Sequence, residues 1–407
     1  MRRKATRLFL ILAGVVLVVV AGILLSVGAR SGKRASGARL DRIKASPQWH
    51  ADKQRFSNRM GQYQASFFEM GRKYFFGGSK ERLPKAEIKT IKVDPALFKK
   101  PPRSGLRITW AGHSSFIIEL DELKVLIDPV WSDRASPFTW AGPKRFYAPP
   151  LPLDDLPAID AVLISHDHYD HLDYETVLHL KDKPLKWLVP LGVGAHLQYW
   201  GVDAAKIEEL DWWENRTFKG VKLTATPARH FSGRSAMFLD QNATLWAGWA
   251  LNGATRSVFY SGDTALHPGF KEIGERLGPF DLTLMETGAY NSLWPDVHLG
   301  PEQAALAHQL VRGKVMMPSH WGLFDLALHG WTEPAERVIK AAEALNVSLS
   351  IIKPGGTFDI ADAPTIDQFW PKTPWQGANE APAWSTEVET LQAPLRAKAL
   401  SSPDTEP

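Results

Sequence analysis

The sequence predicts a large domain of mixed α and β structure, with a transmembrane helix ahead of it. From Arg107 onward, short β-rich runs are separated by turn residues, and helical stretches separate or follow these runs. An apolar stretch from Leu8 to Gly28 carries no charge and is interrupted only by Ser26. The chain has 407 residues and 44% hydrophobic content, which is enough to bury a full core.

The first element, residues 1–30, is the expected membrane anchor. Its apolar stretch has about the length that a helix needs to cross a ~30 Å hydrocarbon core. A cleaved signal peptide is the alternative, but the apolar run is longer than the usual ~7–15 residues and no clear cleavage site follows. Basic residues flank both ends, so the positive-inside rule does not decide the orientation. We expect an uncleaved single-pass anchor, with the side of the membrane left open.

The second element, residues 31–104, is a basic and aromatic linker and arm. Between Gln48 and Pro102, aromatic residues such as Phe68 and Phe76 are interleaved with cations such as Arg72. Such a segment can lie on a bilayer surface, with its rings at headgroup level and its cations toward lipid phosphates. It can equally pack as an amphipathic arm on the domain that follows. The sequence does not choose between these two arrangements.

The third element, residues 105–360, carries most of the expected secondary structure. Apolar and β-branched runs predict strands at 107–110, 115–120, 124–127, 161–165, 187–189, 221–226, 236–239, 244–249, 257–260, 282–285, 315–317 and 349–352. Helical patterns cover 174–180, 301–311 and 333–345, the first with Asp173 as a candidate N-cap. The last element, residues 361–407, is a C-terminal extension that we expect to be largely disordered.

Composition limits the chemistry and the partners. The chain has no cysteine, which excludes disulfides, thiolate metal sites and cysteine nucleophiles. A net charge of +4 and an isoelectric point near 9.0 reflect a mild basic excess, most of it in the first hundred residues. This excess favours an anionic membrane surface over nucleic acid as a partner, because no nucleic-acid-binding motif is visible. The oligomeric state is left open.

The most informative segment is His166-Asp167-His168-Tyr169-Asp170-His171, directly after the apolar run Ala161 to Ser165. Three imidazoles and two carboxylates are hard to explain by packing, because each would need a buried partner or open water. In an extended segment His166, His168 and Asp170 point the same way, and His171 follows at a turn. The pattern predicts ligands for zinc, with iron or manganese also suited. A solvated loop that binds nothing is the alternative.

Three further ligand-type residues follow apolar runs at expected strand ends: His230, Asp263 and His320. Strand ends are where a fold brings distant side chains together at one rim. Together with the histidine-rich segment, these residues form a set large enough for two metal ions.

Several motifs give the chain a resemblance to a known family. The histidine-rich segment, His230, Ser261-Gly262-Asp263-Thr264 and Ser319-His320-Trp321-Gly322 resemble the metallo-β-lactamase superfamily. Further segments resemble one branch of this superfamily, the N-acyl-phosphatidylethanolamine-hydrolysing phospholipase D family. These segments are 109–115, Ile127-Asp128-Pro129, 142–146, 164–174, 209–213 and Gly288-Ala289-Tyr290. The resemblance covers roughly Leu106 to Leu345.

The resemblance implies a four-layer αββα sandwich with two zinc ions at one edge, between its two sheets. The implied ligands are His166, His168 and His230 for one ion, Asp170, His171 and His320 for the other, and Asp263 as the bridge. His113 and Asp128 would orient these ligands through hydrogen bonds, or would instead be satisfied polar residues of the core.

The resemblance also assigns residues to the reaction. Tyr290 and His298 would contact the substrate, and His298 or bound water would protonate the leaving group. A loop histidine in water is the alternative for His298. Asp170 would help to orient the nucleophile. Glu286-Thr287 and Val297 depart from the better-known members of the branch, which are less polar at the first position and polar at the second.

The predicted function is that of a membrane-anchored dizinc hydrolase that cleaves a phosphodiester by attack of a metal-bridging hydroxide. The resemblance points to an (N-acyl)phosphatidylethanolamine-type phospholipid and a reaction of the phospholipase D type. The same ligands would serve a hydrolase of a lactone, a β-lactam or a soluble phosphodiester equally well. A non-catalytic, membrane-tethered metal-binding module is the alternative from another class.

Overall fold

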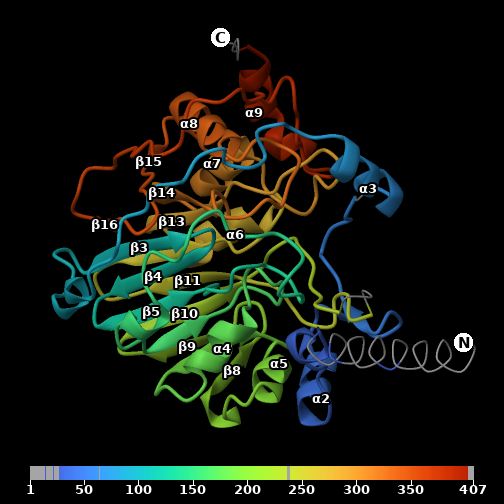
Figure 1. The fold of residues 1–407 in the computed structure, drawn as a ribbon, viewed down its shortest axis with the longest axis vertical. Helices are drawn as coiled ribbons and strands as arrows, with labels where there is room; N and C mark the ends of the chain where they lie inside the picture. The colour runs from blue at the N-terminus through green and yellow to red at the C-terminus, as the bar shows by residue number, and fades with distance from the viewer. Residues whose placement is uncertain (1–13, 15–21, 23–26, 64, 236–238, 402–407) are drawn as a thin grey trace, which may run out of the picture.

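Two sheets packed face to face form the centre of the molecule, and helices cover both outer faces (Figure 1). The computed structural model describes residues 14, 22, 27–63, 65–235 and 239–401. Apolar side chains from both sheets meet in one core cluster, and a second cluster fills the space between one sheet and its covering helices. The expected αββα arrangement is confirmed.

The first sheet is antiparallel at one side and parallel at the other. Its strands, in spatial order, are β16 (Thr357–Asp359), β3 (Leu106–Gly112), β4 (Ser115–Leu120), β5 (Leu123–Ile127), β6 (Ala161–Leu163), β7 (Lys186–Pro190) and β8 (Ile207–Leu210). Pairing is antiparallel from β16 to β5 and parallel from β5 to β8. Its outer face is covered by α4 (Tyr174–Leu180) and α5 (Gly194–Tyr199).

The second sheet is likewise parallel at one side and antiparallel at the other. Its strands, in spatial order, are β15 (Ser348–Leu349), β14 (Gly313–Ser319), β13 (Phe280–Glu286), β12 (Ser257–Tyr260), β11 (Gly248–Asn252), β10 (Val221–Thr226) and β9 (Asn215–Phe218). Pairing is parallel from β15 to β12 and antiparallel from β12 to β9. Three helices cover it: α6 (Gly269–Leu277), α7 (Pro301–Leu310) and α8 (Glu333–Leu345).

Local sequence explains most of these elements. Strands β3 and β13 are buried along their whole length, as expected for strands with covered faces. The predicted N-cap of α4 is confirmed, because the Asp173 side chain accepts a hydrogen bond from the backbone N–H of Thr176. Helix α8 ends at Asn346, whose left-handed conformation (φ 54°) is a common way to stop a helix.

Three predicted strands are only partly observed, and a fourth cannot be compared. Of 161–165, only Ala161–Leu163 forms β6. Residues 244–247 do not join β11, because the backbone of Leu245 and Ala247 bonds to Leu191 and Ser165 of the opposite layer. Of the last predicted run, 349–352, only Leu349 joins the sheet, as part of β15. Residues 236–238 of another predicted strand lie outside the described residues. The strands β8, β9 and β16 were not predicted, because they lie at sheet edges and are rich in polar residues.

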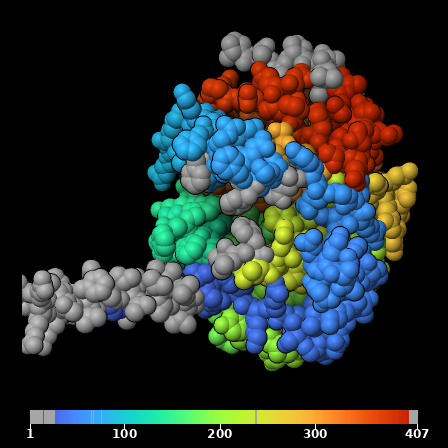
Figure 2. Space-filling view, turned by 90° about the vertical axis from the view of Figure 1, so that its right-hand side faces the viewer, coloured from blue at the N-terminus to red at the C-terminus, as the bar shows by residue number. Residues whose placement is uncertain are grey.

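The N-terminal arm has two parts with different surroundings. The first part packs on the domain through α2 (Ala38–Lys44) and a short hairpin of β1 (Trp49–His50) and β2 (Arg55–Phe56), with Ile43 and Phe56 buried. The second part contains α3 (Phe67–Phe76), where Phe68 and Phe76 are 80% and 89% exposed. Figure 2 shows residues of this arm at the surface of the molecule. The first part therefore packs on the domain as an arm, and the bilayer-surface arrangement stays a prediction for the second part.

The predicted anchor, Leu8 to Gly28, lies almost entirely outside the described residues. Within the part of the chain that the structure does describe, no helix combines the length and the apolar character that a membrane span requires.

The C-terminal extension differs from the disorder expected for it. In its described part, residues 361–401, Trp370 and Val388 join the main core cluster, and α9 (Glu389–Ser401) packs against α7. The side-chain amide of Gln303 on α7 donates hydrogen bonds to Ser385 and Gln392. The extension is held by a few separate contacts, which leave no periodic pattern in the sequence.

Removing one tryptophan that joins the two sheets should destabilise the protein strongly. Trp249 on β11 is fully buried, and its indole N–H donates to the carbonyl of Ile164 beyond β6 at 3.0 Å. We expect Trp249→Ala to lower the free energy of unfolding by roughly 3–5 kcal/mol, because it leaves a cavity and an unpaired carbonyl. Urea unfolding measures the change. Trp140→Ala is the matched control, since Trp140 is 65% exposed; equal losses in the two variants would contradict this account.

Candidate metal centre

The predicted ligand residues meet at one edge of the sandwich. The strands that precede them all end at this edge. Strands β10, β12 and β14 run in one direction within the second sheet, because they are related by parallel pairing or by two antiparallel steps, and β6 ends there in the first sheet. His113 and Asp128 follow β3 and β5, which run in the same direction as β6 in the first sheet. Side chains from six separate segments of the chain therefore converge there.

His166, His168 and His230 form the first group of nitrogen ligands. His168 Nδ1 lies 2.8 Å from His166 Nε2 and 3.3 Å from His230 Nε2. The three ring nitrogens therefore point at one another. The remaining ring nitrogens of two of these residues are held in place, since His166 Nδ1 contacts Ser165 Oγ and His230 Nδ1 contacts the carbonyl of Val297. The rings are fixed with one nitrogen each directed at a common point.

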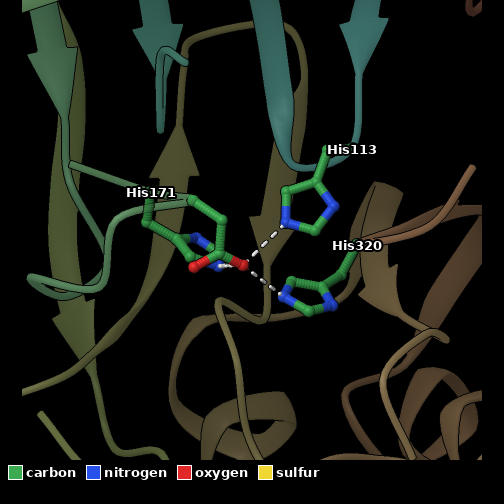
Figure 3. Close-up of side chains that lie close together, drawn as sticks. His113, His171 and His320 are labelled. Carbon is green, nitrogen blue, oxygen red and sulfur yellow. Dashed lines mark hydrogen bonds and ion pairs between the residues drawn. The ribbon is translucent and has the colours of Figure 1, made fainter. Parts of the chain in front are cut away.

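Asp170, His171 and His320 form the second group, and His113 joins it. Figure 3 shows the rings of the three histidines converging on one carboxylate oxygen. This oxygen is Asp170 Oδ2, which lies 3.0 Å from His113 Nε2, 3.2 Å from His320 Nε2 and 3.4 Å from His171 Nε2.

Asp263 lies between the two groups. Its Oδ2 is 3.0 Å from His320 Nε2 and 3.1 Å from His171 Nε2 of the second group. The same oxygen is 3.7 Å from His166 Nε2 of the first group. Gly262, in the left-handed region at φ 59°, makes the turn that aims Asp263 inward; a Cβ there would lie 2.8 Å from the carbonyl oxygen of Ala247. All seven predicted ligands are thus brought together, with Asp263 at the position expected of a bridge.

The donor set fits divalent metal ions. Asp263 Oδ1 is buried without a hydrogen-bond partner among the described residues, which is costly for a polar atom unless something binds it. Imidazole nitrogens and carboxylate oxygens are the donors that zinc and similar ions use in proteins. Ligand atoms of each group lie within 4.8 Å of one another.

Burial and neighbouring charge set the protonation of these histidines. Burial lowers the pKa of His166, His168 and His230, so these rings are neutral and can donate a lone pair to a metal. Burial also lowers the pKa of His320, but Asp263 and Asp170 outweigh it and raise the pKa to about 10. In the metal-free protein His320 is therefore protonated and balances the carboxylates that a cation would otherwise balance.

Asp128 and His113 form hydrogen bonds with two of the predicted ligands, His171 and Asp170. Asp128 Oδ2 accepts hydrogen bonds from His171 Nδ1 at 2.7 Å and from the Tyr260 hydroxyl at 2.6 Å. His113, Asp128 and the ligand His320 all have positive φ angles, of 53°, 37° and 61°. Such strained backbone is kept at sites where the surrounding structure enforces a particular geometry.

The two predicted substrate contacts differ in their surroundings. His298 lies beside the cluster, with Nδ1 3.9 Å from Asp263 Oδ2 and its side chain 13% exposed. Tyr290 is buried, its hydroxyl donates to Glu333 Oε1, and its ring stacks on His329. A substrate contact by Tyr290 therefore has no support in this structure, because the polar end of the side chain is already used in the core.

Glu286 is the residue that the predicted site lacks. It is fully buried at the end of β13 and forms a hydrogen bond with His298 Nδ1. Burial, with repulsion from Asp263 as the next cause, raises the pKa of Glu286 well above its usual range. Its position at a strand end, like those of Asp263 and His320, is the signal in the sequence that could have identified it.

This fold and this site define a metallo-hydrolase of the β-lactamase superfamily. Residues 124–321 match the model of the β-lactamase superfamily domain. An isothiocyanate hydrolase from Delia radicum gut bacteria, 21% identical, has the same fold, with a TM-score of 0.51 over 62% of this chain and 98% of that chain.

Two relatives show to which family within this superfamily the chain belongs. An uncharacterised protein of Mycobacterium tuberculosis is 47% identical over 271 residues, which are 66% of this chain and 72% of the relative. The N-acyl-phosphatidylethanolamine-hydrolyzing phospholipase D 1 of Caenorhabditis elegans is 39% identical over 254 residues, which are 59% of this chain and 71% of the relative. The chain belongs to the family of this phospholipase D within the metallo-β-lactamase superfamily of metal-dependent hydrolases.

Metal binding should strengthen as the pH rises. A proton on His320, whose pKa is about 10 in the metal-free protein, competes with the metal at every pH below that value. Each displaced proton gives roughly a tenfold gain in apparent affinity per pH unit. Competition with a chromogenic chelator at pH 6, 7 and 8, corrected for protonation of the chelator, measures the slope. A pH-independent affinity would contradict the assigned protonation.

Proposed function

We propose that the chain is a membrane-anchored dizinc phosphodiesterase that cleaves (N-acyl)phosphatidylethanolamine-type phospholipids in a reaction of the phospholipase D type. The observation that carries this proposal is the arrangement of six ligand-type side chains in two groups, with Asp263 between them. The 39% identity with the worm phospholipase D supports the substrate class.

The residues of the site have different roles in the proposed reaction. His166, His168 and His230 would hold one ion, Asp170, His171 and His320 the other, with Asp263 shared between them. Two zinc ions, when bound, supply Lewis acidity: they lower the pKa of water and stabilise negative charge on the phosphate. Asp128 and His113 keep His171 and Asp170 in place through their hydrogen bonds. His298, at the open side of the cluster, donates a hydrogen bond to a phosphate oxygen or a proton to the leaving group.

Membrane attachment supplies the lipid substrate in this proposal. Leu8 to Gly28 would insert as the anchor, and the exposed part of the arm would rest on the bilayer. Five of the large hydrophobic side chains exposed in the described residues lie in this part: Tyr63, Phe68, Tyr74, Phe76 and Leu83. Exposed cations, Arg72 and Lys80 among them, lie in the same segment. Aromatic rings and cations together suit the headgroup region of an anionic membrane.

A substrate panel tests the proposed reaction. Purified zinc-loaded protein is incubated with N-acyl-phosphatidylethanolamine, phosphatidylethanolamine, a chromogenic phosphodiester and a lactone. We expect phosphatidic acid from the lipids. Asp263→Ala should abolish turnover and reduce bound zinc, because it removes the residue shared by both groups. His179→Ala is the control, since His179 lies on α4 outside the cluster. Turnover of the lactone alone, or an active metal-free Asp263→Ala protein, would refute the proposal.

Vesicle binding tests the membrane surface. Replacing Phe68 and Phe76 by serine should weaken binding of the chain lacking residues 1–28 to anionic vesicles by at least about tenfold, because two exposed rings no longer enter the bilayer. Tyr199→Ser on α5 is the control: Tyr199 is 51% exposed, and Figure 1 shows α5 far from α3. Co-sedimentation measures the binding. Equal binding by all three proteins would contradict a role of α3.

A further inference from the structure

Glu286 is a buried carboxylate that neither the proposed ligand set nor the apolar core explains. It ends β13, a strand that is buried along its whole length. Among the described residues it forms no ion pair with a lysine or an arginine, and burial raises the pKa of this carboxyl group accordingly. Its polar neighbours are instead a backbone N–H and two histidines of the site.

The two oxygens of Glu286 make different contacts. Oε2 accepts a hydrogen bond from the backbone N–H of Thr264 at 2.6 Å, directly after Asp263 in the chain. Oε1 is hydrogen-bonded to His298 Nδ1 and lies 3.9 Å from His320 Nδ1. The backbone N–H of Glu286 is also fixed, because it donates to Ser261 Oγ at 3.0 Å. The carboxylate therefore ties the position of His298 to the loop that carries Asp263.

His298 is held on one side and open on the other. Its ring lies between those of His230 and His320, with centroid distances of 5.1 and 5.2 Å. Nδ1 is hydrogen-bonded to Glu286, and the described residues form no hydrogen bond with Nε2. The side chain of His298 is 13% exposed, and Nε2 is the ring nitrogen left for an incoming molecule. A carboxylate that occupies one nitrogen of a histidine fixes both the ring orientation and the role of the other nitrogen.

We propose that Glu286 is a positioning residue, which orients His298 so that Nε2 faces the phosphodiester. The inference rests on the proposed function for the reaction that His298 serves. Glu286 does not touch the substrate and holds no metal in this arrangement. It acts through His298 alone, and its effect on turnover disappears when His298 is absent.

A double-mutant cycle tests this dependence in the zinc-loaded full chain. We expect Glu286→Leu to lower kcat about 10- to 100-fold with little change in KM or zinc content, because His298 loses the partner of Nδ1. Glu286→Gln should restore most of kcat, since an amide can keep both the Thr264 and the His298 contacts. In a His298→Ala background, Glu286→Leu should cause no further loss. Glu302→Gln is the matched control for loss of a buried carboxylate, because Glu302 pairs with Arg337 between α7 and α8; its kcat should not change.

Several outcomes would overturn the inference. Equal losses from Glu286→Leu in the presence and absence of His298 would show a role in stability only. A third metal ion per chain that Glu286→Leu removes would make Glu286 a ligand, as its place within 4.8 Å of Asp263, His298 and His320 permits. Full activity of His298→Ala would remove the residue that Glu286 is proposed to orient.

A readout without turnover separates this inference from the proposed function. Histidine ring ¹⁵N shifts of the zinc-loaded protein report which nitrogen of His298 is engaged. We expect one fixed state in the wild type and in Glu286→Gln, and an averaged state in Glu286→Leu. Unchanged shifts in Glu286→Leu overturn the positioning role even if every phosphodiester is cleaved. Failure of the whole substrate panel with the expected shifts overturns the proposed function and leaves the ring orientation established.

Discussion

The burial of negative charge at one edge of the sandwich is the constraint on which the site depends. Asp263 is almost fully buried and has no lysine or arginine partner among the described residues. A carboxylate in such surroundings is stable only when positive charge lies next to it. The neighbouring imidazoles supply that charge as protonated rings in the metal-free protein, and bound cations would supply it in their place. Binding of metal ions at this edge would therefore displace protons from these imidazoles.

The N-terminal arm and the C-terminal extension both contact loops of the site. Arg229, next to His230, donates hydrogen bonds to the carbonyls of Gly61 in the arm and Thr386 in the C-terminal extension. It also pairs with the buried Asp296, two residues before His298. The Arg229 guanidinium therefore connects the arm and the C-terminal extension to the loops that carry His230 and His298. These contacts hold the arm and the extension against the loops, although neither segment has a regular apolar pattern.

Prediction from the sequence succeeded where one local property decides the structure. Strands β4, β10 and β12 and helices α4 and α8 have the predicted bounds, because their apolar runs or periodic patterns begin and end at clear turn or capping residues. The edge strands β8, β9 and β16 were missed, since an edge strand has one open side and needs no apolar run. Residues 244–247 looked like a strand but cross between the layers, where their apolar side chains are equally buried.

The sequence by itself determined the chemistry of the site: the absence of cysteine, the spacing of the histidine-rich segment, and ligand-type residues after three further apolar runs. It determined these because donor type and strand-end position are local properties. Only the tertiary structure decided which donors share a group, that Glu286 meets His298, and that the Tyr290 hydroxyl is already bound to Glu333. These outcomes depend on how parallel strands and their loops are placed side by side. Such contacts join residues far apart in the chain, and the local sequence pattern does not predict them.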